Sequence, residues 1–275
     1  GDGTVSDLNT GQMWVQARGP KVTWDAAVEG AGNCRVGGHR DWRMPTIKEL
    51  YSLINFSGGF HGWVNNSRPY LDTNYFHFAY GDESRNERPI DCQDWTATQY
   101  VSTTMNGDAT VFGVNFADGR IKGYPKIRRR FEGTSPNKLH VRYVRGNPAY
   151  GRNDFCDNGN GTITDRATDL MWSKTDSKLG LDWQAALAWV QACNAGKHLG
   201  FSDWRLPNAK ELQSIVDYTR APTVTQSPAI DPVFETTRLS DGEYPFFWSS
   251  TSHLEGPARQ QGTAAVYVAF GRGLG

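Results

Sequence analysis

The chain has 275 residues, with 29 basic and 29 acidic side chains and a formal net charge of zero. A neutral chain lacks the overall field that attracts nucleic acid, so we expect no nucleic-acid partner. Thirty glycines, thirteen prolines and ten tryptophans indicate many loops, short strands and aromatic packing. No apolar run reaches the roughly 18 residues of a membrane span, so no membrane insertion is expected in this segment. The chain begins inside a motif, so we expect a processed or partial chain.

One stretch of ten residues occurs twice. Residues 41–50 read Asp-Trp-Arg-Met-Pro-Thr-Ile-Lys-Glu-Leu, and residues 203–212 read Asp-Trp-Arg-Leu-Pro-Asn-Ala-Lys-Glu-Leu, an offset of 203 − 41 = 162. Seven of the ten positions are identical. Self-similarity of this kind predicts two copies of one domain, which we place at residues 1–146 and 147–275.

Each copy begins with a predicted hairpin, at residues 3–14 and 161–172, where alternating β-branched and polar residues flank a turn. Residues 157–161, Asp-Asn-Gly-Asn-Gly, resemble part of a calcium-binding loop. They lack the distal bidentate glutamate of such a loop, so we interpret them as a tight turn. We predict no metal site and no cofactor, with calcium as the one ion that has any support.

Two helices follow in each copy. Apolar residues at helical spacing predict a first helix that starts at Trp24 and again at Trp183. The repeated stretch starts the second helix, because its Thr46 and Asn208 each precede a glutamate by three residues, as in a capping box. We interpret this stretch as structural, and an arginine that contacts a ligand is the alternative. The motif residues are Trp42, Arg43, Pro45, Glu49, Trp204, Arg205, Pro207 and Glu211.

A long irregular segment comes next, at residues 55–91 and 219–245. Loops of this length inside a compact domain are typically functional. The first is crowded with aromatic residues, and most of them must pack the loop itself. Trp63, which lies among polar residues, is the candidate for an exposed ring that stacks on a sugar.

A strand pair then closes each copy, at residues 94–98 with 111–116 and at residues 247–251 with 266–270. The first copy continues to a last strand at residues 140–146. The second copy ends five residues after Phe270, so its last strand is missing. Either the chain is clipped there, or another chain fills the gap by strand addition.

The strongest local concentration of charge is basic and lies in the first copy, at Lys122, Lys126, Arg128, Arg129 and Arg130. In a neutral chain, such a stretch is a candidate site for a sulfated glycan, a phosphate or an acidic partner. The alternative is a solvated loop whose charges point in several directions.

Four cysteines, Cys34, Cys92, Cys156 and Cys193, allow three pairings if all are bridged. Four free thiols in a reducing compartment are the alternative. The sequence has no Cys-x-x-Cys spacing, so structural zinc is not expected. It also lacks the Gly-x-Ser-x-Gly, His-Glu-x-x-His, P-loop and dinucleotide motifs, so we predict no catalytic residue and no enzyme activity.

Several segments, in their order and spacing, resemble a bacterial domain family, the DUF1566 group, which includes the C-terminal domain of the Legionella collagen-like adhesin. They include Thr-Gly-x-Met-Trp, Thr-Trp-Asp-Ala-Ala, Asp-Trp-Arg-Met-Pro-Thr-x-Lys-Glu-Leu and Val-Arg-Tyr-Val-Arg. The resemblance covers nearly all of the first copy and all but the end of the second. It implies an α+β fold with two tandem C-type-lectin-like domains. Each would have a small antiparallel sheet, two helices and long irregular loops.

The resemblance also bears on the cysteines and on function. The family often has a cysteine in the last strand, where this chain has Tyr143, so the implied pairs become Cys34–Cys92 and Cys156–Cys193, in an oxidising compartment. The family implies a non-catalytic adhesion or binding module that is extracellular, at the cell surface or periplasmic. A glycan, such as a sulfated polysaccharide, is the preferred ligand, and another surface protein or self-association are further partners. The alternative is a structural subunit of a surface filament or sheath.

Overall fold

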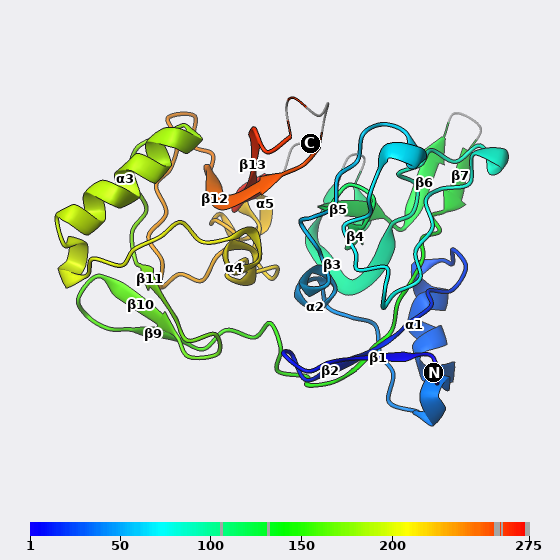
Figure 1. The fold of residues 1–275 in the computed structure, drawn as a ribbon. Helices are drawn as coiled ribbons and strands as arrows, with labels where there is room; N and C mark the ends of the chain where they lie inside the picture. Colours follow the sequence, from blue (N-terminus) through cyan, green and yellow to red (C-terminus); the bar gives the residue numbers. More distant parts are fainter. Residues whose placement is uncertain (105–106, 131–132, 256–258, 260, 273–275) are drawn as a thin grey trace. The chain divides into compact units, whose positions relative to one another are not determined.

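The computed structural model describes residues 1–104, 107–130, 133–255, 259 and 261–272, without the side chain of Arg130. The chain divides into two compact units, one of residues 1–150 with 253–264 and one of residues 151–252 with 265–275. Both units contain short helices and small antiparallel sheets (Figure 1). The α+β class predicted from the sequence is therefore confirmed.

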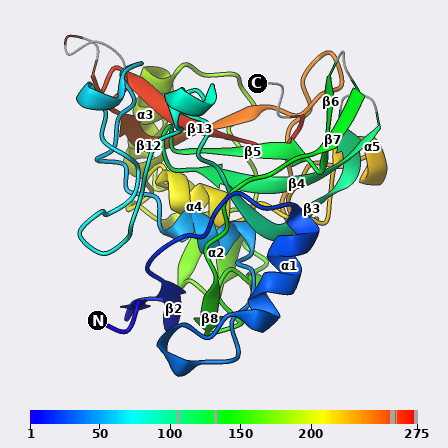
Figure 2. The same cartoon turned by 90° about the vertical axis from the view of Figure 1, so that its right-hand side faces the viewer.

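The first unit has two three-stranded sheets, with strand orders β1-β2-β8 and β3-β4-β5, and a separate β6-β7 hairpin. Helices α1 and α2 pack against β3 (Figure 2). Its helices and strands are β1 (Thr4–Asp7), β2 (Gln12–Val15), α1 (Trp24–Asn33), α2 (Ile47–Ser52), β3 (Asp94–Thr104), β4 (Asp108–Asn115), β5 (Arg120–Pro125), β6 (Ile127–Arg130), β7 (Gly133–Pro136) and β8 (Val144–Gly146). Single turns of 3₁₀ helix lie at Val36–Gly38, Val64–Asn66 and Glu83–Arg85.

The second unit repeats the first hairpin, the two helices and the closing strand pair. Its elements are β9 (Phe155–Asp157), β10 (Thr162–Asp165), β11 (Leu170–Ser173), α3 (Trp183–Ala195), α4 (Ala209–Ser214), α5 (Pro222–Thr225), β12 (Phe246–His253) and β13 (Ala264–Ala269), with a 3₁₀ turn at His198–Gly200. The strand order β11-β10-β9 differs from that of the first unit. The third strand pairs with β10, the counterpart of β1, and this leaves β11 at the edge of the sheet.

The helix starts follow from local chemistry. Thr46 and Asn208 cap α2 and α4, and both predicted capping boxes are complete. Thr23 and Asp182 cap α1 and α3 in the same way, because their side chains accept a backbone N–H of the first turn. Residues 157–161, weighed above as a calcium loop, form the turn between β9 and β10.

Each unit has its own core. The first core contains Ala27, Met44, Trp95, Val111, Leu139 and Val141, so two of its members come from the segment just before β8. The second core contains Leu212, Ile215, Val216, Ile230 and Phe270. None of these comes from a last strand, since the second unit has no such segment among its described residues.

All four cysteines are free thiols, and neither predicted pair, Cys34–Cys92 or Cys156–Cys193, is bridged in this structure. Cys92 is buried, with its thiol 3.6 Å from the carbonyl oxygen of Pro89, and burial raises the pKa of this thiol to about 12. Cys34 is the C-terminal cap of α1. A thiol with so high a pKa holds little of the thiolate that disulfide formation requires.

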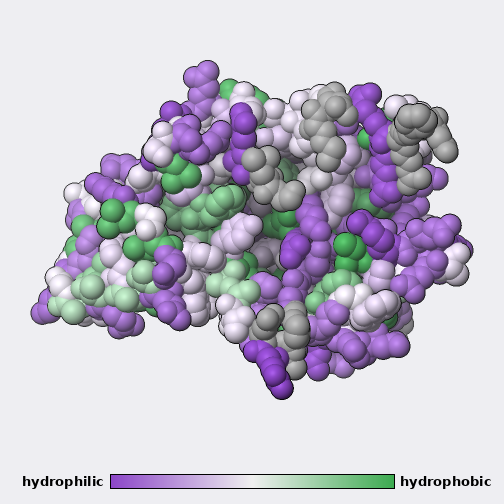
Figure 3. Space-filling view, turned by 90° about the horizontal axis from the view of Figure 1, so that it is seen from above, coloured by the Kyte–Doolittle hydropathy of each residue, from purple (hydrophilic) through white to green (hydrophobic). Residues whose placement is uncertain are grey.

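No helix among the described residues is long and apolar enough to cross a membrane. On the face shown in Figure 3, hydrophobic residues lie in separate areas among hydrophilic ones.

Candidate functional site

The carboxylate of Glu49 lies at the centre of the repeated stretch in the first unit. Its side chain is 1% exposed and accepts two guanidinium N–H groups of Arg43, at 2.7 and 2.5 Å. It also accepts the side-chain amide of Gln12 at 2.7 Å and the backbone N–H of Thr46 at 2.8 Å. The bond to Glu49 raises the pKa of Arg43. We call this bidentate pair the Arg–Glu clamp, and its hydrogen-bonding capacity is used within the protein.

The second unit has the same clamp in a more exposed setting. Arg205 donates to Glu211 twice at 2.7 Å, and the Asn208 backbone N–H donates to Glu211 at 2.8 Å. The bond from Arg205 lowers the pKa of Glu211. The side chain of Glu211 is 20% exposed, against 1% for Glu49, and that of Arg205 is 58% exposed, against 33% for Arg43.

Tryptophans tie the repeated elements together in both units. In each copy, three indole N–H groups donate to a backbone carbonyl outside their own helix or strand, so burial leaves them satisfied. The pairs are Trp24–Thr96, Trp42–Val36 and Trp95–Val22 in the first copy, and Trp183–Ser249, Trp204–His198 and Trp248–Leu181 in the second. The carbonyls of Pro45 and Pro207 likewise accept equivalent N–H groups, from Ala97 and Ser250, at 2.8 Å. The motif thus joins helix to sheet.

The last strand of the first copy lies between β2 and the repeated stretch. Val15 N donates to Tyr143 O at 3.0 Å, and Arg43 N donates to Val144 O at 2.9 Å. The Tyr143 hydroxyl donates to the carbonyl of Ala27 in α1 at 2.9 Å. The segment from Leu139 to Gly146 therefore bonds to three different elements at once.

Arg142 anchors this strand from inside the unit. Its side chain is almost completely buried, and its guanidinium donates to the carbonyls of Val15, Gln16 and His77. Burial lowers the pKa of Arg142 to about 10. Its neighbours are backbone carbonyls and the Phe76 ring, so this cation holds the strand to the long loop.

The predicted basic stretch is not a loop, because β5 and β6 contain most of it. Lys122 pairs with Asp118 at 2.6 Å, and Arg129 pairs with Asp108 at 2.7 Å. Lys126 donates to Gln99 at 2.8 Å and lies 3.6 Å from the centre of the Trp24 ring. Arg128 is exposed, and the side chain of Arg130 lies outside the described residues. Much of the charge that made the stretch a candidate is therefore balanced by neighbouring side chains.

In the long loop of the first unit, residues 55–91, some aromatic side chains pack inside the protein and others are exposed. Tyr70 and Phe76 are buried, and the rings of Phe60 and Phe78 both lie against Tyr80. Trp63 has 72% of its surface exposed. An exposed indole of this size can stack on the apolar face of a sugar.

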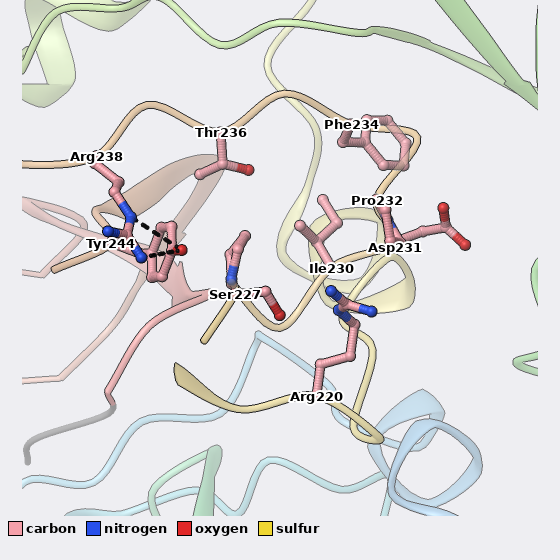
Figure 4. Close-up of a pocket in the computed structure, with 10 residues that line it drawn as sticks. Arg220, Ser227, Ile230, Asp231, Pro232, Phe234, Thr236, Arg238 and Tyr244 are labelled. Carbon is pink, nitrogen blue, oxygen red and sulfur yellow. Dashed lines mark hydrogen bonds between the residues drawn. The ribbon is translucent and has the colours of Figure 1, made fainter. Parts of the chain in front are cut away.

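A pocket of about 300 Å³ lies in the long loop of the second unit, and sequence reasoning did not find it. Figure 4 shows Arg220 entering from one side and Arg238 with Tyr244 from the other, with Ser227, Ile230 and Thr236 between them. The remaining lining residues are Pro228, Asp231, Pro232 and Phe234. The pocket combines two guanidinium groups with apolar and aromatic walls.

The two arginines of this pocket differ in their bonding. Arg238 donates to the Tyr244 hydroxyl from Nε and Nη2, at 3.1 and 2.9 Å. The Nε of Arg220 is buried and has no hydrogen-bond partner, and within the described part of the chain Arg220 makes no ion pair. A buried donor without a partner costs free energy until an acceptor reaches it. Arg220 therefore provides a vacant donor for an anionic or carbonyl oxygen.

Two positions in the loop that forms this pocket differ between the copies. Gly58 and Arg220 donate their backbone N–H to the equivalent carbonyls of Asn55 and Asp217. Tyr70 and Ala229 also occupy equivalent positions, because their backbone N–H groups donate to the equivalent carbonyls of Phe116 and Phe270. In the first unit a Cβ on Gly58 would lie 2.7 Å from the ring of Tyr70. The second unit has Ala229 in place of Tyr70 and Arg220 in place of Gly58, and a comparison of the two loops would have pointed to Arg220.

Within the described part of the chain, no three His, Cys, Asp or Glu side chains are placed to hold a metal ion. In the turn considered for calcium, Asp157 accepts the N–H of Gly159 at 2.9 Å and pairs with Lys174 at 2.8 Å. Its carboxylate oxygens are thus bonded within the protein.

Fold and site together define a tandem pair of small α+β domains. The two domains share the Arg–Glu clamp and the indole hydrogen bonds, and their long loops differ. The chain belongs to the family described as the Lcl C-terminal domain, whose model matches residues 3–145 and 161–274. The resemblance seen in the sequence, and the two copies, are thereby confirmed. Lcl is the Legionella collagen-like protein, so the family is that of an adhesin-like bacterial surface module and is not a known enzyme family. No curated protein and no solved structure matches the chain.

Proposed function

We propose that the protein is a non-catalytic binding module of a bacterial surface and that its ligand is a glycan bearing sulfate or carboxylate groups. The observation that carries the proposal is the unpartnered Nε of Arg220 at the wall of the pocket in the second unit. An arginine binds two oxygens of a carboxylate or a sulfate well, because its donors form a fixed fork. The adjoining Tyr244 and Phe234 offer apolar surface to a sugar ring.

The first unit contributes differently to this proposal. Trp63 supplies an exposed stacking surface, and Arg128 is an exposed cation on β6. Lys122, Lys126 and Arg129 are held by neighbouring side chains, so an incoming anion must compete with them. We therefore assign the principal contact to the second unit and a supporting one to the first.

A glycan array with heparin competition tests this proposal. Arg220→Gln keeps a polar side chain but shortens it and removes the cation, and it should reduce binding at least about tenfold, a loss of about 1.4 kcal/mol. Arg166→Gln is the matched control, because Arg166 is an exposed arginine of the same unit outside the pocket. Equal binding by the two variants would exclude the pocket as the site.

A second arm tests the basic stretch, with Lys126, Arg128, Arg129 and Arg130 changed to alanine together. We expect at most a few-fold loss with these four changes. A complete loss, with Arg220→Gln unaffected, would place the site in the first unit instead.

A structural role in a surface filament is the second candidate, and the edge strand β11 is the observation that favours it. An unpaired edge is a template for another strand. Light scattering at high protein concentration tests this role, and a protein that stays monomeric would argue against it.

A further inference from the structure

The walls of the Arg220 pocket in the second unit carry charges of both signs. The lining residues include two cations, Arg220 and Arg238, and one carboxylate, Asp231, so their formal charge is 2 − 1 = +1 (Figure 4). Within the described part of the chain, none of the three forms an ion pair. One negative charge on a ligand neutralises such a pocket, whereas each further negative charge is repelled by the Asp231 carboxylate. The charges therefore favour a ligand group with a single negative charge.

The two arginines offer that group different contacts. Arg238 is held at the wall, because its Nε and Nη2 donate to the Tyr244 hydroxyl, which in turn donates to Gln226 O at 3.3 Å. The guanidinium of Arg220 makes no hydrogen bond within the described residues, and its Nε is buried. The Nε–H and one Nη–H of a guanidinium point the same way and match the two oxygens of a carboxylate. Arg220 is therefore the direct contact, and Arg238 adds charge.

The pocket also contains groups that suit the hydroxyls of a sugar. One carboxylate oxygen of Asp231 accepts the backbone N–H of Val233 at 2.8 Å, and the other has no hydrogen-bond partner within the described residues. The Thr236 hydroxyl is also without a partner there. A carboxylate accepts a hydrogen bond from a sugar hydroxyl, and a threonine hydroxyl can donate or accept one. Ile230 and Phe234 add an apolar wall for the face of the ring.

The size of the pocket limits the ligand to one ring. The volume is about 300 Å³. Small-molecule sites span roughly 300–1,000 Å³, so this pocket is at the lower end of the range and is too small for a run of several sugars. One wall is fixed in advance, because Thr237 donates to the Asp176 carboxylate from its backbone N and its Oγ1, both at 2.6 Å. A wall that is already ordered reduces the entropy lost on binding.

We propose that the Arg220 pocket binds one sugar residue with a single negative charge, of the uronic-acid type, and that Asp231 discriminates against sugars with several sulfates. Arg220 binds the carboxylate of the sugar, and Asp231 and Thr236 bind its hydroxyls. The inference rests on the proposed function and narrows it, because it selects one class among the acidic glycans.

Isothermal titration calorimetry with three single-ring sugars tests the inference. The probes are methyl glucuronide with one negative charge, methyl glucoside with none, and N-sulfoglucosamine 6-sulfate with two sulfates. We expect the glucuronide to bind at least about tenfold more tightly than either of the others. The glucoside lacks the carboxylate that Arg220 binds, and the second sulfate is repelled by Asp231. Arg220→Gln should weaken glucuronide binding at least about tenfold.

Asp231→Asn separates charge selectivity from a merely structural role. Asparagine still accepts the N–H of Val233, so the turn is kept while the negative charge is removed. We expect the disulfated sugar to bind about tenfold more tightly to this variant, with glucuronide binding unchanged or weaker. A damaged fold would weaken both sugars. Asp241→Asn is the matched control, because Asp241 also accepts a backbone N–H two residues on, from Glu243 at 3.0 Å, and lies outside the pocket.

The outcomes distinguish this inference from the proposed function. If the disulfated sugar binds as tightly as the glucuronide and Arg220→Gln abolishes both, the pocket is still the glycan site but the charge selectivity is refuted. If N-acetylglutamate amide binds as tightly as the glucuronide, the pocket is a site for an acidic peptide and the inference is overturned. If none of the sugars binds, the inference is overturned, and a negative glycan array would overturn the proposed function as well.

Discussion

The two copies share the first hairpin, the two helices and the Arg–Glu clamp, and they differ in the strands that surround these elements. In the first, Leu139–Gly146 lies between β2 and the repeated stretch, and the Glu49 carboxylate of the clamp is buried. In the second, β11 is an edge strand, and the clamp residues Arg205 and Glu211 are largely or partly exposed. Identical contacts therefore carry different free energies in the two copies. Removing one partner of a clamp should cost more where the carboxylate is buried than where it is partly exposed.

The largest expected effect comes from removing the last strand from the first copy. Val144→Pro deletes the N–H that bonds to Arg43 O at 3.0 Å and places a ring in a fully buried position. The loss in the free energy of unfolding should exceed about 3 kcal/mol. Chemical denaturation measures it, and hydrogen exchange should show that the amides of Val15 and Arg43 then exchange faster than in the unaltered protein. Unchanged protection would mean that the strand does not shield them.

The clamps provide a matched pair of substitutions. Glu49→Gln removes a carboxylate that is 1% exposed and leaves Arg43 without its counter-ion, so we expect a loss of about 3 kcal/mol. Glu211→Gln makes the same change at a partly exposed clamp and should cost about 1 kcal/mol. Denaturation of the two variants measures the difference. Equal losses would show that burial by the last strand does not set the strength of the clamp.

A smaller effect is expected from Tyr143→Phe, which removes one hydroxyl and keeps the ring. The hydroxyl donates to Ala27 O at 2.9 Å, so its loss should cost about 1 kcal/mol in the first unit. Hydrogen exchange of peptides from α1 should rise, while peptides from α3 should not change. Faster exchange in both helices would mean that the bond is not what ties the strand to α1.

The smallest effect is a dependence on pH that belongs to the second clamp. The bond from Arg205 lowers the pKa of Glu211 below its usual 4.5 in the folded protein. The unfolded chain then binds more protons just below pH 4.5, so stability rises with pH in this window. The contribution is present above pH 4.5 and is lost as the pH falls through the folded pKa. Glu211→Gln should flatten this dependence in acid denaturation, and an unchanged slope would assign it to other carboxylates.

The helix starts and the first hairpins could be predicted from the sequence because neighbouring residues determine them. The Thr46 and Asn208 capping boxes, the helix starts at Trp24 and Trp183 and the first hairpins each depend on residues close together in the chain. These features need no knowledge of what packs against them.

The candidate sites were harder to predict because they depend on contacts between distant residues. Nothing local shows that Asp108 and Asp118 neutralise part of the basic stretch, or that Lys126 lies over Trp24. The walls of the pocket at Arg220 come from residues as far apart in the chain as Ser227 and Tyr244, and only the fold brings them together. The ring contacts of Tyr80 with Phe60 and Phe78 likewise follow from the path of the loop.

The Arg–Glu clamp has a consequence for how such a domain changes over generations. Because Arg43 and Glu49 bond each other twice, replacing either one first leaves the other charge without its partner. Replacing both together removes that penalty, but it requires two simultaneous changes. A single substitution at Arg43 or Glu49 is therefore expected to be disfavoured, and substitutions at the positions around them are expected to be tolerated. The duplicated halves of this chain still share the pair, although the long loops that follow it, residues 55–91 and 219–245, have diverged in sequence.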